Sequence, residues 1–197
     1  MNHNIYKSAF GIRLRPALVE DSEMILELRS NPSLTEHMGS FEVSLDQQIE
    51  WMKSYLARPD EYYFIIESGD MPVGTLGIYN TKKMDDGSTE AEWGRWILRR
   101  EYAVGPISAY LLLGTAFDDL GVETLFCQTT QGNHSVIAFH DMFAHRAEGR
   151  ESTVYRDAKK QEVIFHEYSK SDWAKTRKQL EGLARITAAR SALERSL

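Results

Sequence analysis

The chain has 197 residues, a formal net charge of −6 and a single cysteine, Cys127. The acidic balance excludes the strongly basic surface that generic nucleic-acid binding needs, and one cysteine excludes both an intrachain disulfide framework and a cysteine metal cluster. Hydrophobic residues make up 42% of the chain, which predicts a sizeable core, and no apolar run is long enough for a signal core or a membrane span. We therefore expect a cytoplasmic protein that acts without a membrane, a nucleic-acid partner or a metal.

The first half of the chain combines strand patterns with two amphipathic helices. Residues 12–16 alternate apolar and basic side chains, which predicts a half-buried strand, and a helical pattern follows it. A second helix is predicted after Ser44, its expected N-cap, because Gln47 stands three residues further on. Two apolar runs around the turn "GDMP" predict an antiparallel hairpin, and residues 89–100 predict a long strand after it.

The second half alternates helices and strands. We expect a helix over residues 106–120 that closes at Gly121, then a strand, a helix capped by Asn133, and two final strands. From about residue 171 one more helical pattern begins, either a surface or docking helix or a partly frayed terminus. The order predicts an α/β (α+β mixed) fold with one domain over residues 1–169 and a helical extension over 170–197.

This order resembles the GCN5-related N-acetyltransferase superfamily from about Gly11 to Tyr168. The passage "IRLRPALVEDSEMILELR" resembles the family's opening strand and helix, and "AEWGRWIL" its fourth strand in the ribosomal-protein and amino-sugar branches. The passages "AVGPISAYLLLGTAFDDLG" and "NHSVIAFHDMF" lie where the cofactor turn and the Asn-led helix belong. "LRSNPSLTEHMGSFEVSLDQQIEWM" is similar to the front segment of amino-sugar nucleotide N-acetyltransferases.

The resemblance implies a central mixed, mostly antiparallel sheet with a splayed fourth strand, about four flanking helices and a C-terminal helix. It implies transfer of an acetyl group from acetyl-CoA to a primary amine in a ternary complex, with a nucleotide-linked amino sugar as the expected acceptor. Acetylation of a protein N-terminus, as in the ribosomal-protein branch, and a non-catalytic acyl-CoA-binding module are the alternatives. The C-terminal helix also makes a homodimer conceivable.

The turn before the first helix of the second half is the expected pyrophosphate site. A helix N-terminus offers unpaired N–H groups and a partial positive charge. We expect Gly105 as the N-cap and Pro106 at the first helical position, where a missing N–H costs nothing. At two positions of this turn, Tyr102 and Ile107, the chain departs from the family's pattern. The alternative to a pyrophosphate site is a helix that merely starts with Gly-Pro. The expected cofactor-binding residues are Trp96, Ile97, Leu98, Arg99, Arg100, Val104, Gly105, Ile107, Ser108 and Asn133.

Two residues are the catalytic candidates. Glu92 stands where several branches of the family have a Glu that deprotonates the incoming ammonium through water; the alternative is an ion pair with Arg95 or Arg13. His140 stands where family members usually have a Tyr that protonates the leaving thiolate. An imidazolium at position 140 could serve as this acid, or the thiolate leaves unaided and His140 only hydrogen-bonds a neighbour.

The acceptor is expected at the side of the first two helices and the hairpin. An Arg there could bind a phosphate, and an aromatic ring could support a sugar. For each candidate taken alone, the alternative to a substrate contact is an ordinary place in the core or on the surface. The expected substrate-binding residues are Arg29, His37, Met38, Tyr79 and Trp93.

Overall fold

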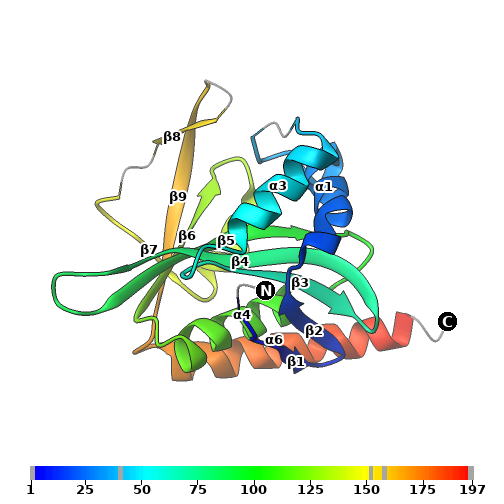
Figure 1. The fold of residues 1–197 in the computed structure, drawn as a ribbon. Helices are drawn as coiled ribbons and strands as arrows, with labels where there is room; N and C mark the ends of the chain where they lie inside the picture. The colour runs from blue at the N-terminus through cyan, green and yellow to red at the C-terminus, as the bar shows by residue number, and fades with distance from the viewer. Residues whose placement is uncertain (1–2, 40–41, 151–152, 157–158, 195–197) are drawn as a thin grey trace.

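The computed structural model describes residues 3–39, 42–150, 153–156 and 159–194. One twisted sheet runs through the middle of the molecule (Figure 1). Its strands are β1 (Lys7–Ala9), β2 (Ile12–Pro16), β3 (Tyr62–Ser68), β4 (Met71–Lys83), β5 (Thr89–Leu98), β6 (Thr124–Thr130), β7 (His145–Arg146), β8 (Thr153–Arg156) and β9 (Lys159–Ser169). They lie in the order β1-β2-β3-β4-β5-β6-β9-β7, with β8 beside β9. All neighbours pair antiparallel except β5 and β6, which are parallel, so the predicted mixed, mostly antiparallel sheet is confirmed.

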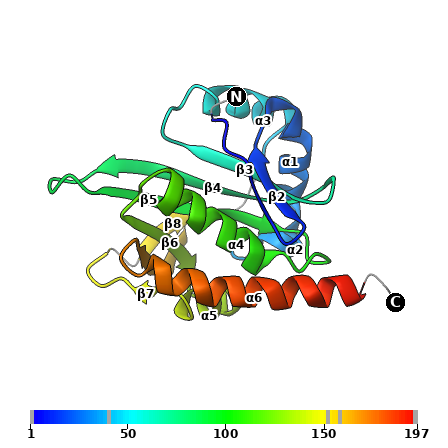
Figure 2. The same ribbon diagram turned by 90° about the horizontal axis from the view of Figure 1, so that it is seen from below.

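Helices cover both faces of the sheet. α1 and α3 pack on one face, and α4 and α6 pack on the other (Figures 1 and 2). The central strand β3 therefore alternates between two cores: Tyr63 and Ile65 face α1 and α3, whereas Phe64 and Ile66 face the larger core. The helices are α1 (Ser22–Ser30), α2 (Pro32–Thr35), α3 (Leu45–Tyr55), α4 (Gly105–Gly114), α5 (His134–Asp141) and α6 (Trp173–Glu194).

Local signals set most helix ends. Ser44 caps α3 as predicted, because its hydroxyl accepts from the Gln47 amide at 3.2 Å while the Gln47 side chain accepts from the Ser44 amide at 2.8 Å. α4 begins one residue before the predicted position, with Val104 rather than Gly105 as its N-cap and Pro106 in its second position. The helix then widens into a π-helical turn, Thr115–Asp119.

Two short elements of the first half escaped the sequence analysis, as did β7 in the second half. β1 pairs with β2 through a two-residue turn in which Phe10 and Gly11 have φ of 53° and 77°. The single turn α2 follows α1, capped by the Asn31 side chain, which accepts from the Ser33 amide at 3.0 Å. Neither has the length or the apolar periodicity that a sequence pattern needs to be read.

The C-terminal helix α6 shares the larger core. Trp173, Leu180 and Ala184 are buried against the side of the molecule that carries α4. The Trp173 indole N–H donates to Asp118 at 2.9 Å, which joins α6 to the π-helical turn. Of the two roles considered for this segment, a docked helix agrees with the structure as far as Glu194. Among the described residues, none of the helices has the length and apolar character that crossing a bilayer requires.

The strands β5 and β6 separate in the middle of the sheet. They pair only from Glu90 to Glu92, opposite Thr124 to Phe126, and diverge beyond that point. On its other side β5 bulges against β4, with Arg95 at a left-handed φ of 53°. The Thr75 hydroxyl donates to the Arg95 carbonyl at 2.8 Å and so stabilises the bulge. The predicted splayed strand is thus β5.

Candidate active site

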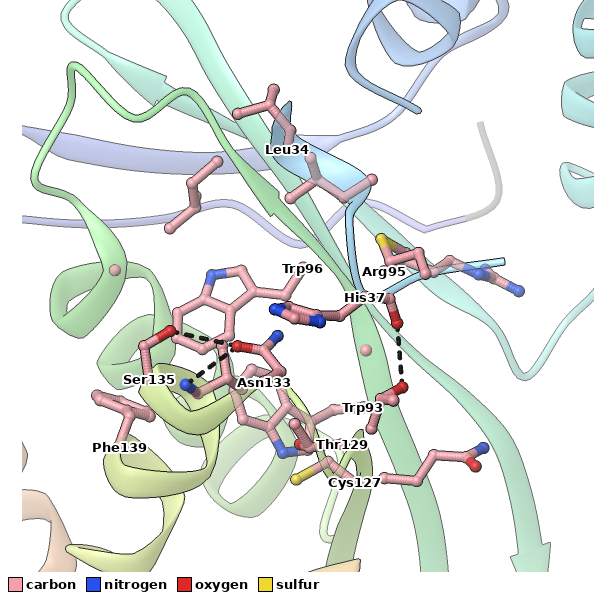
Figure 3. A pocket seen from close by; sticks show the side chains of 18 of the residues that line it. Leu34, His37, Trp93, Arg95, Trp96, Cys127, Thr129, Asn133, Ser135 and Phe139 are labelled. Atoms are coloured by element: carbon pink, nitrogen blue, oxygen red, sulfur yellow. Dashed lines mark hydrogen bonds between the residues drawn. The ribbon is translucent and has the colours of Figure 1, made fainter. Parts of the chain in front are cut away.

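A cavity of about 840 Å³ opens where β5 and β6 separate. Trp93 and Trp96 come to it from β5 and Phe139 from α5, while His37 reaches it from the segment after α2 (Figure 3). Most of the residues predicted for the site meet here. Those that line the cavity are Arg29, His37, Met38, Tyr79, Glu92, Trp93, Trp96, Ile97, Leu98, Arg100, Gly105, Asn133 and His140.

Glu92 is a buried carboxylate held by neutral donors. Its side chain accepts from the Tyr79 hydroxyl at 3.2 Å and the Gln128 amide at 3.0 Å, both at Oε1, and from the Asn80 amide at 2.8 Å at Oε2. The residue is only 5% exposed, yet it lines the cavity. A carboxylate oxygen can accept two hydrogen bonds, so Oε2 can take one more donor.

The ion pair considered as the alternative for Glu92 does not form. Arg95 pairs with Glu61 at 3.0 Å, and Arg13 pairs with Glu67 at 2.7 Å. Within the described residues, no Lys or Arg forms an ion pair with Glu92. The carboxylate is therefore available to a proton from the cavity, although its catalytic role stays a prediction.

Tyr79 reaches Glu92 because Gly94 has no side chain. A Cβ atom at position 94 would lie 2.4 Å from the Tyr79 hydroxyl oxygen, closer than atoms can approach. Burial raises the pKa of Tyr79 well above its ordinary value, and the charge of Glu92 acts in the same direction. Tyr79 therefore stays protonated and donates to Glu92, a contact different from the substrate contact expected of it.

Sequence reasoning missed Asn80 and Gln128, the other two donors to Glu92. Gln128 is a polar residue inside the apolar strand passage "LFCQTT", and this was the one signal available. Asn80 adopts a left-handed φ of 54° at the irregular register of β4 against β5. Only the pairing of the strands brings both amides to Glu92.

His140 is buried as a neutral imidazole. It is 2% exposed, with Nδ1 2.7 Å from the Tyr168 hydroxyl and Nε2 3.5 Å from the Cys127 sulfur. Burial, and to a smaller extent the neighbouring His166, lower the pKa of His140 to about 3, although Asp141 acts in the opposite direction. The imidazolium considered for this position is therefore not populated near neutral pH, so protonation of the thiolate by a charged His140 does not fit its surroundings.

The N-terminus of α4 faces the cavity through fewer groups than expected. The Ser108 amide already donates to the Val104 carbonyl at 2.9 Å, and its hydroxyl accepts from the Trp96 indole N–H at 3.1 Å. Ser108 thus positions Trp96 and does not line the cavity. The Ile107 side chain is 2% exposed and belongs to the core, so this departure from the family pattern adds no bulk to the cavity. Gly105 lines the cavity, whereas Val104 is buried beside it.

The two arginines before α4 are both engaged by the N-terminal half of the chain. Arg99 donates twice to Glu27, at 2.9 and 2.8 Å, and does not line the cavity, so its phosphate contact stays a prediction. Arg100 lines the cavity and donates to the Ser33 carbonyl.

α2 and the residues that follow it cross between the separated strands. Arg100, which follows β5, holds Ser33, and the Thr130 hydroxyl at the end of β6 donates to the His37 carbonyl at 3.0 Å. The segment Ser33–His37 therefore spans the cavity from one strand to the other (Figure 3).

Asn133 has a structural role as well as a cavity position. Its side-chain oxygen accepts from the Val136 amide at 3.4 Å and from the Ser135 hydroxyl at 3.2 Å, which caps α5 as predicted. A ligand contact would therefore come from its Nδ2 group.

A cavity that opens between two separating parallel strands, beside the start of a helix, is the arrangement of an acyl-CoA-dependent acyltransferase. The pantetheine arm can pair with a strand edge, and the helix start can face a phosphate. The family model described as "Acetyltransferase (GNAT) domain" matches residues 12–141. The chain belongs to this family and is an acetyltransferase.

Solved structures agree with this assignment. A protein described as "Apo FdhC- a nucleotide-linked sugar GNAT" is 27% identical, with a TM-score of 0.75 over 90% of this chain and 97% of that one. Spermidine N-acetyltransferase from Vibrio cholerae, solved with CoA and spermine, is 14% identical, with a TM-score of 0.73 over 84% of this chain and 99% of that one, and shows the fold alone. A search of curated proteins finds no match.

Proposed function

We propose that the protein transfers an acetyl group from acetyl-CoA to the primary amine of a nucleotide-linked amino sugar. The observation that carries the proposal is the Glu92 carboxylate, which lies in the cavity, has three neutral donors and has no described ion-pair partner. Such a carboxylate is suited to take a proton from an ammonium group, directly or through water.

In the proposed reaction both substrates are bound together. Glu92 accepts a proton from the ammonium, and the neutral amine attacks the thioester carbon. The C–N bond forms as the C–S bond breaks, the sulfur leaves with the electron pair, and the amide nitrogen loses its second proton to water. A free thiol has a pKa near ~8.5, so the thiolate is a fair leaving group without a strong acid.

Two arginines support an anionic acceptor. Arg95 lies over the Tyr79 ring, 4.4 Å from the ring centroid, and the Tyr79 hydroxyl contacts Glu92. The Tyr79 side chain therefore connects Arg95 to Glu92. The NH1 group of Arg95 is buried and has no hydrogen-bond partner among the described residues. Burial lowers the pKa of Arg29, and the nearby charge of Arg95 acts in the same direction. A diphosphate would relieve this repulsion between guanidinium groups, whereas a polyamine would add to it.

The relative described as a nucleotide-linked sugar GNAT supports the same acceptor class. The test is release of CoA thiol from acetyl-CoA with a panel of amino-sugar nucleotides, polyamines and N-terminal peptides. We expect turnover with an amino-sugar nucleotide and little with the others. Turnover with spermidine or peptides alone would overturn the acceptor, and tight CoA binding without turnover on any amine would overturn the transferase proposal in favour of a binding module.

A further inference from the structure

Tyr168 and His140 form a buried pair at the edge of the active-site cavity. Tyr168 lies on β9 and His140 on α5, and the hydroxyl oxygen of the first is 2.7 Å from Nδ1 of the second. They are 3% and 2% exposed. The two residues are 28 positions apart in the chain, so only the packing of α5 on the sheet brings them together.

The surroundings decide which atom of this pair carries each proton. A neutral imidazole has one N–H and one bare nitrogen, and a tyrosine hydroxyl has one hydrogen to donate. Among the residues that the structure describes, His140 is the hydrogen-bonding partner of the Tyr168 hydroxyl. A proton on Nδ1 would leave the buried Tyr168 hydrogen without an acceptor, at a cost of about 1–3 kcal/mol. Donation from Tyr168 to Nδ1 satisfies both groups and leaves the ring proton on Nε2.

The Nε2 atom is on the side of the ring that faces Cys127. It lies 3.5 Å from the Cys127 sulfur, and both His140 and Cys127 line the cavity, whereas Tyr168 does not. The Trp93 ring stands edge-on to the imidazole, 5.2 Å between centroids at 84°, which limits rotation of the ring. An N–H held at this position is directed toward the Cys127 sulfur at the cavity wall.

We infer that Tyr168 is a positioning residue: by donating to Nδ1 it holds His140 with the ring proton on Nε2, as a hydrogen-bond donor toward sulfur in the cavity. In the proposed transfer, on which the kinetic consequence rests, the C–S bond breaks and the electron pair leaves with sulfur. The Nε2–H group then donates a hydrogen bond to this thiolate in place of the Cys127 sulfur and keeps its proton. The thiolate takes its proton from water after it leaves.

The groups around the ring favour a hydrogen bond over proton transfer. Burial raises the pKa of Tyr168 well above its ordinary value, so Tyr168 does not replace a proton lost from the imidazole. The His166 ring is tilted by 36° against the His140 ring, with 5.1 Å between their centroids, and its Nε2 lies 3.0 Å from Asp141. The charge of His166 opposes a positive charge on His140. The titratable groups that face the pair are Cys127 on β6, Asp141 on α5 and His166 on β9.

The experiment is long-range ¹H–¹⁵N NMR of the full chain labelled in histidine, with His140 assigned by its absence in His140→Gln. We expect a single Nε2–H tautomer that does not charge between about pH 5 and pH 8. In Tyr168→Phe we expect a mixture of the two tautomers, an acetyl-transfer kcat about 3- to 10-fold lower and an unchanged KM for acetyl-CoA. The exposed Tyr6→Phe is the matched control.

Three results would overturn the inference. They are an Nδ1–H tautomer in the parent protein, charging of His140 within that pH range, and a pure Nε2–H tautomer in Tyr168→Phe. If Tyr168→Phe does not fold, the parent spectrum still decides. Because the spectra need no substrate, an enzyme that acetylates none of the amines tested would refute the proposed function and leave the tautomer measurement standing.

Discussion

Replacing Glu92 with Gln removes one negative charge from the cavity and keeps the size of the side chain. The carboxylate accepts hydrogen bonds from Tyr79, Asn80 and Gln128 at 3.2, 2.8 and 3.0 Å. The side-chain oxygen of the glutamine can still accept from Tyr79 and Gln128. The NH₂ group of the glutamine, however, faces the NH₂ group of Asn80, and both are donors. Rotation of the Asn80 amide by half a turn restores this contact, because it presents oxygen in place of nitrogen.

The effects on stability and on rate are therefore separable. If Asn80 does not rotate, one donor is left unpaired and the free energy of unfolding falls by about 1–3 kcal/mol. The loss of a general base lowers kcat/KM by about 10²- to 10⁴-fold. The deficit in kcat/KM should shrink as the pH rises toward the pKa of the acceptor amine, because the amine then loses its proton to solvent and does not need Glu92.

The assay is CoA thiol release with the best acceptor of the panel, measured across about pH 6–10, with a thermal melt of each variant. Glu50→Gln is the matched control, because it removes the same charge from a carboxylate whose side chain is 70% exposed on α3. A Glu92→Gln enzyme that stays within about threefold of the parent at every pH, against the expected range, would refute the role of Glu92 as base.

Three further predictions test the rest of the site and the fold. Gly105→Val should weaken CoA binding by calorimetry about tenfold or more, because a Cβ there stands 3.6 Å from Trp96 and further carbons enter the cavity; Gly105→Ala is the control, and equal affinity for all three proteins would remove the turn from the binding site. Arg29→Gln should raise the KM for an amino-sugar nucleotide about tenfold and leave that for acetyl-CoA unchanged, and an unchanged acceptor KM would argue against the anion contact. Trp173→Ala should lower the free energy of unfolding by about 3–5 kcal/mol in urea, since Trp173 is 6% exposed; a loss below about 1 kcal/mol would mean that α6 contributes little to the core.

Short-range patterns account for what the sequence determined by itself. The cap of α3 by Ser44 and Gln47 and the cap of α5 by Asn133 involve residues within three positions of each other, and both are as predicted. The order of strands and helices and the separation of β5 from β6 also follow from the passages that resemble the acetyltransferase family. The predicted start of α4 was wrong by one residue, because its N-cap is Val104, a residue type that sequence patterns do not mark as a helix start.

The tertiary structure alone decided the chemical state of the site. The three donors to Glu92 come from β4 and β6, 12 to 36 positions away, and reach it through strand register and an irregular pairing that no periodicity encodes. The same packing pairs Arg95 with Glu61, which removes the alternative ion-pair partner of Glu92, and pairs Arg99 with Glu27 outside the cavity lining. It also buries His140, and burial disfavours the charged imidazole that the sequence alone allowed. Residue type and spacing therefore predicted most of the residues that line the cavity. Long-range contacts determined the hydrogen-bond donors of Glu92, and desolvation determined that His140 is neutral.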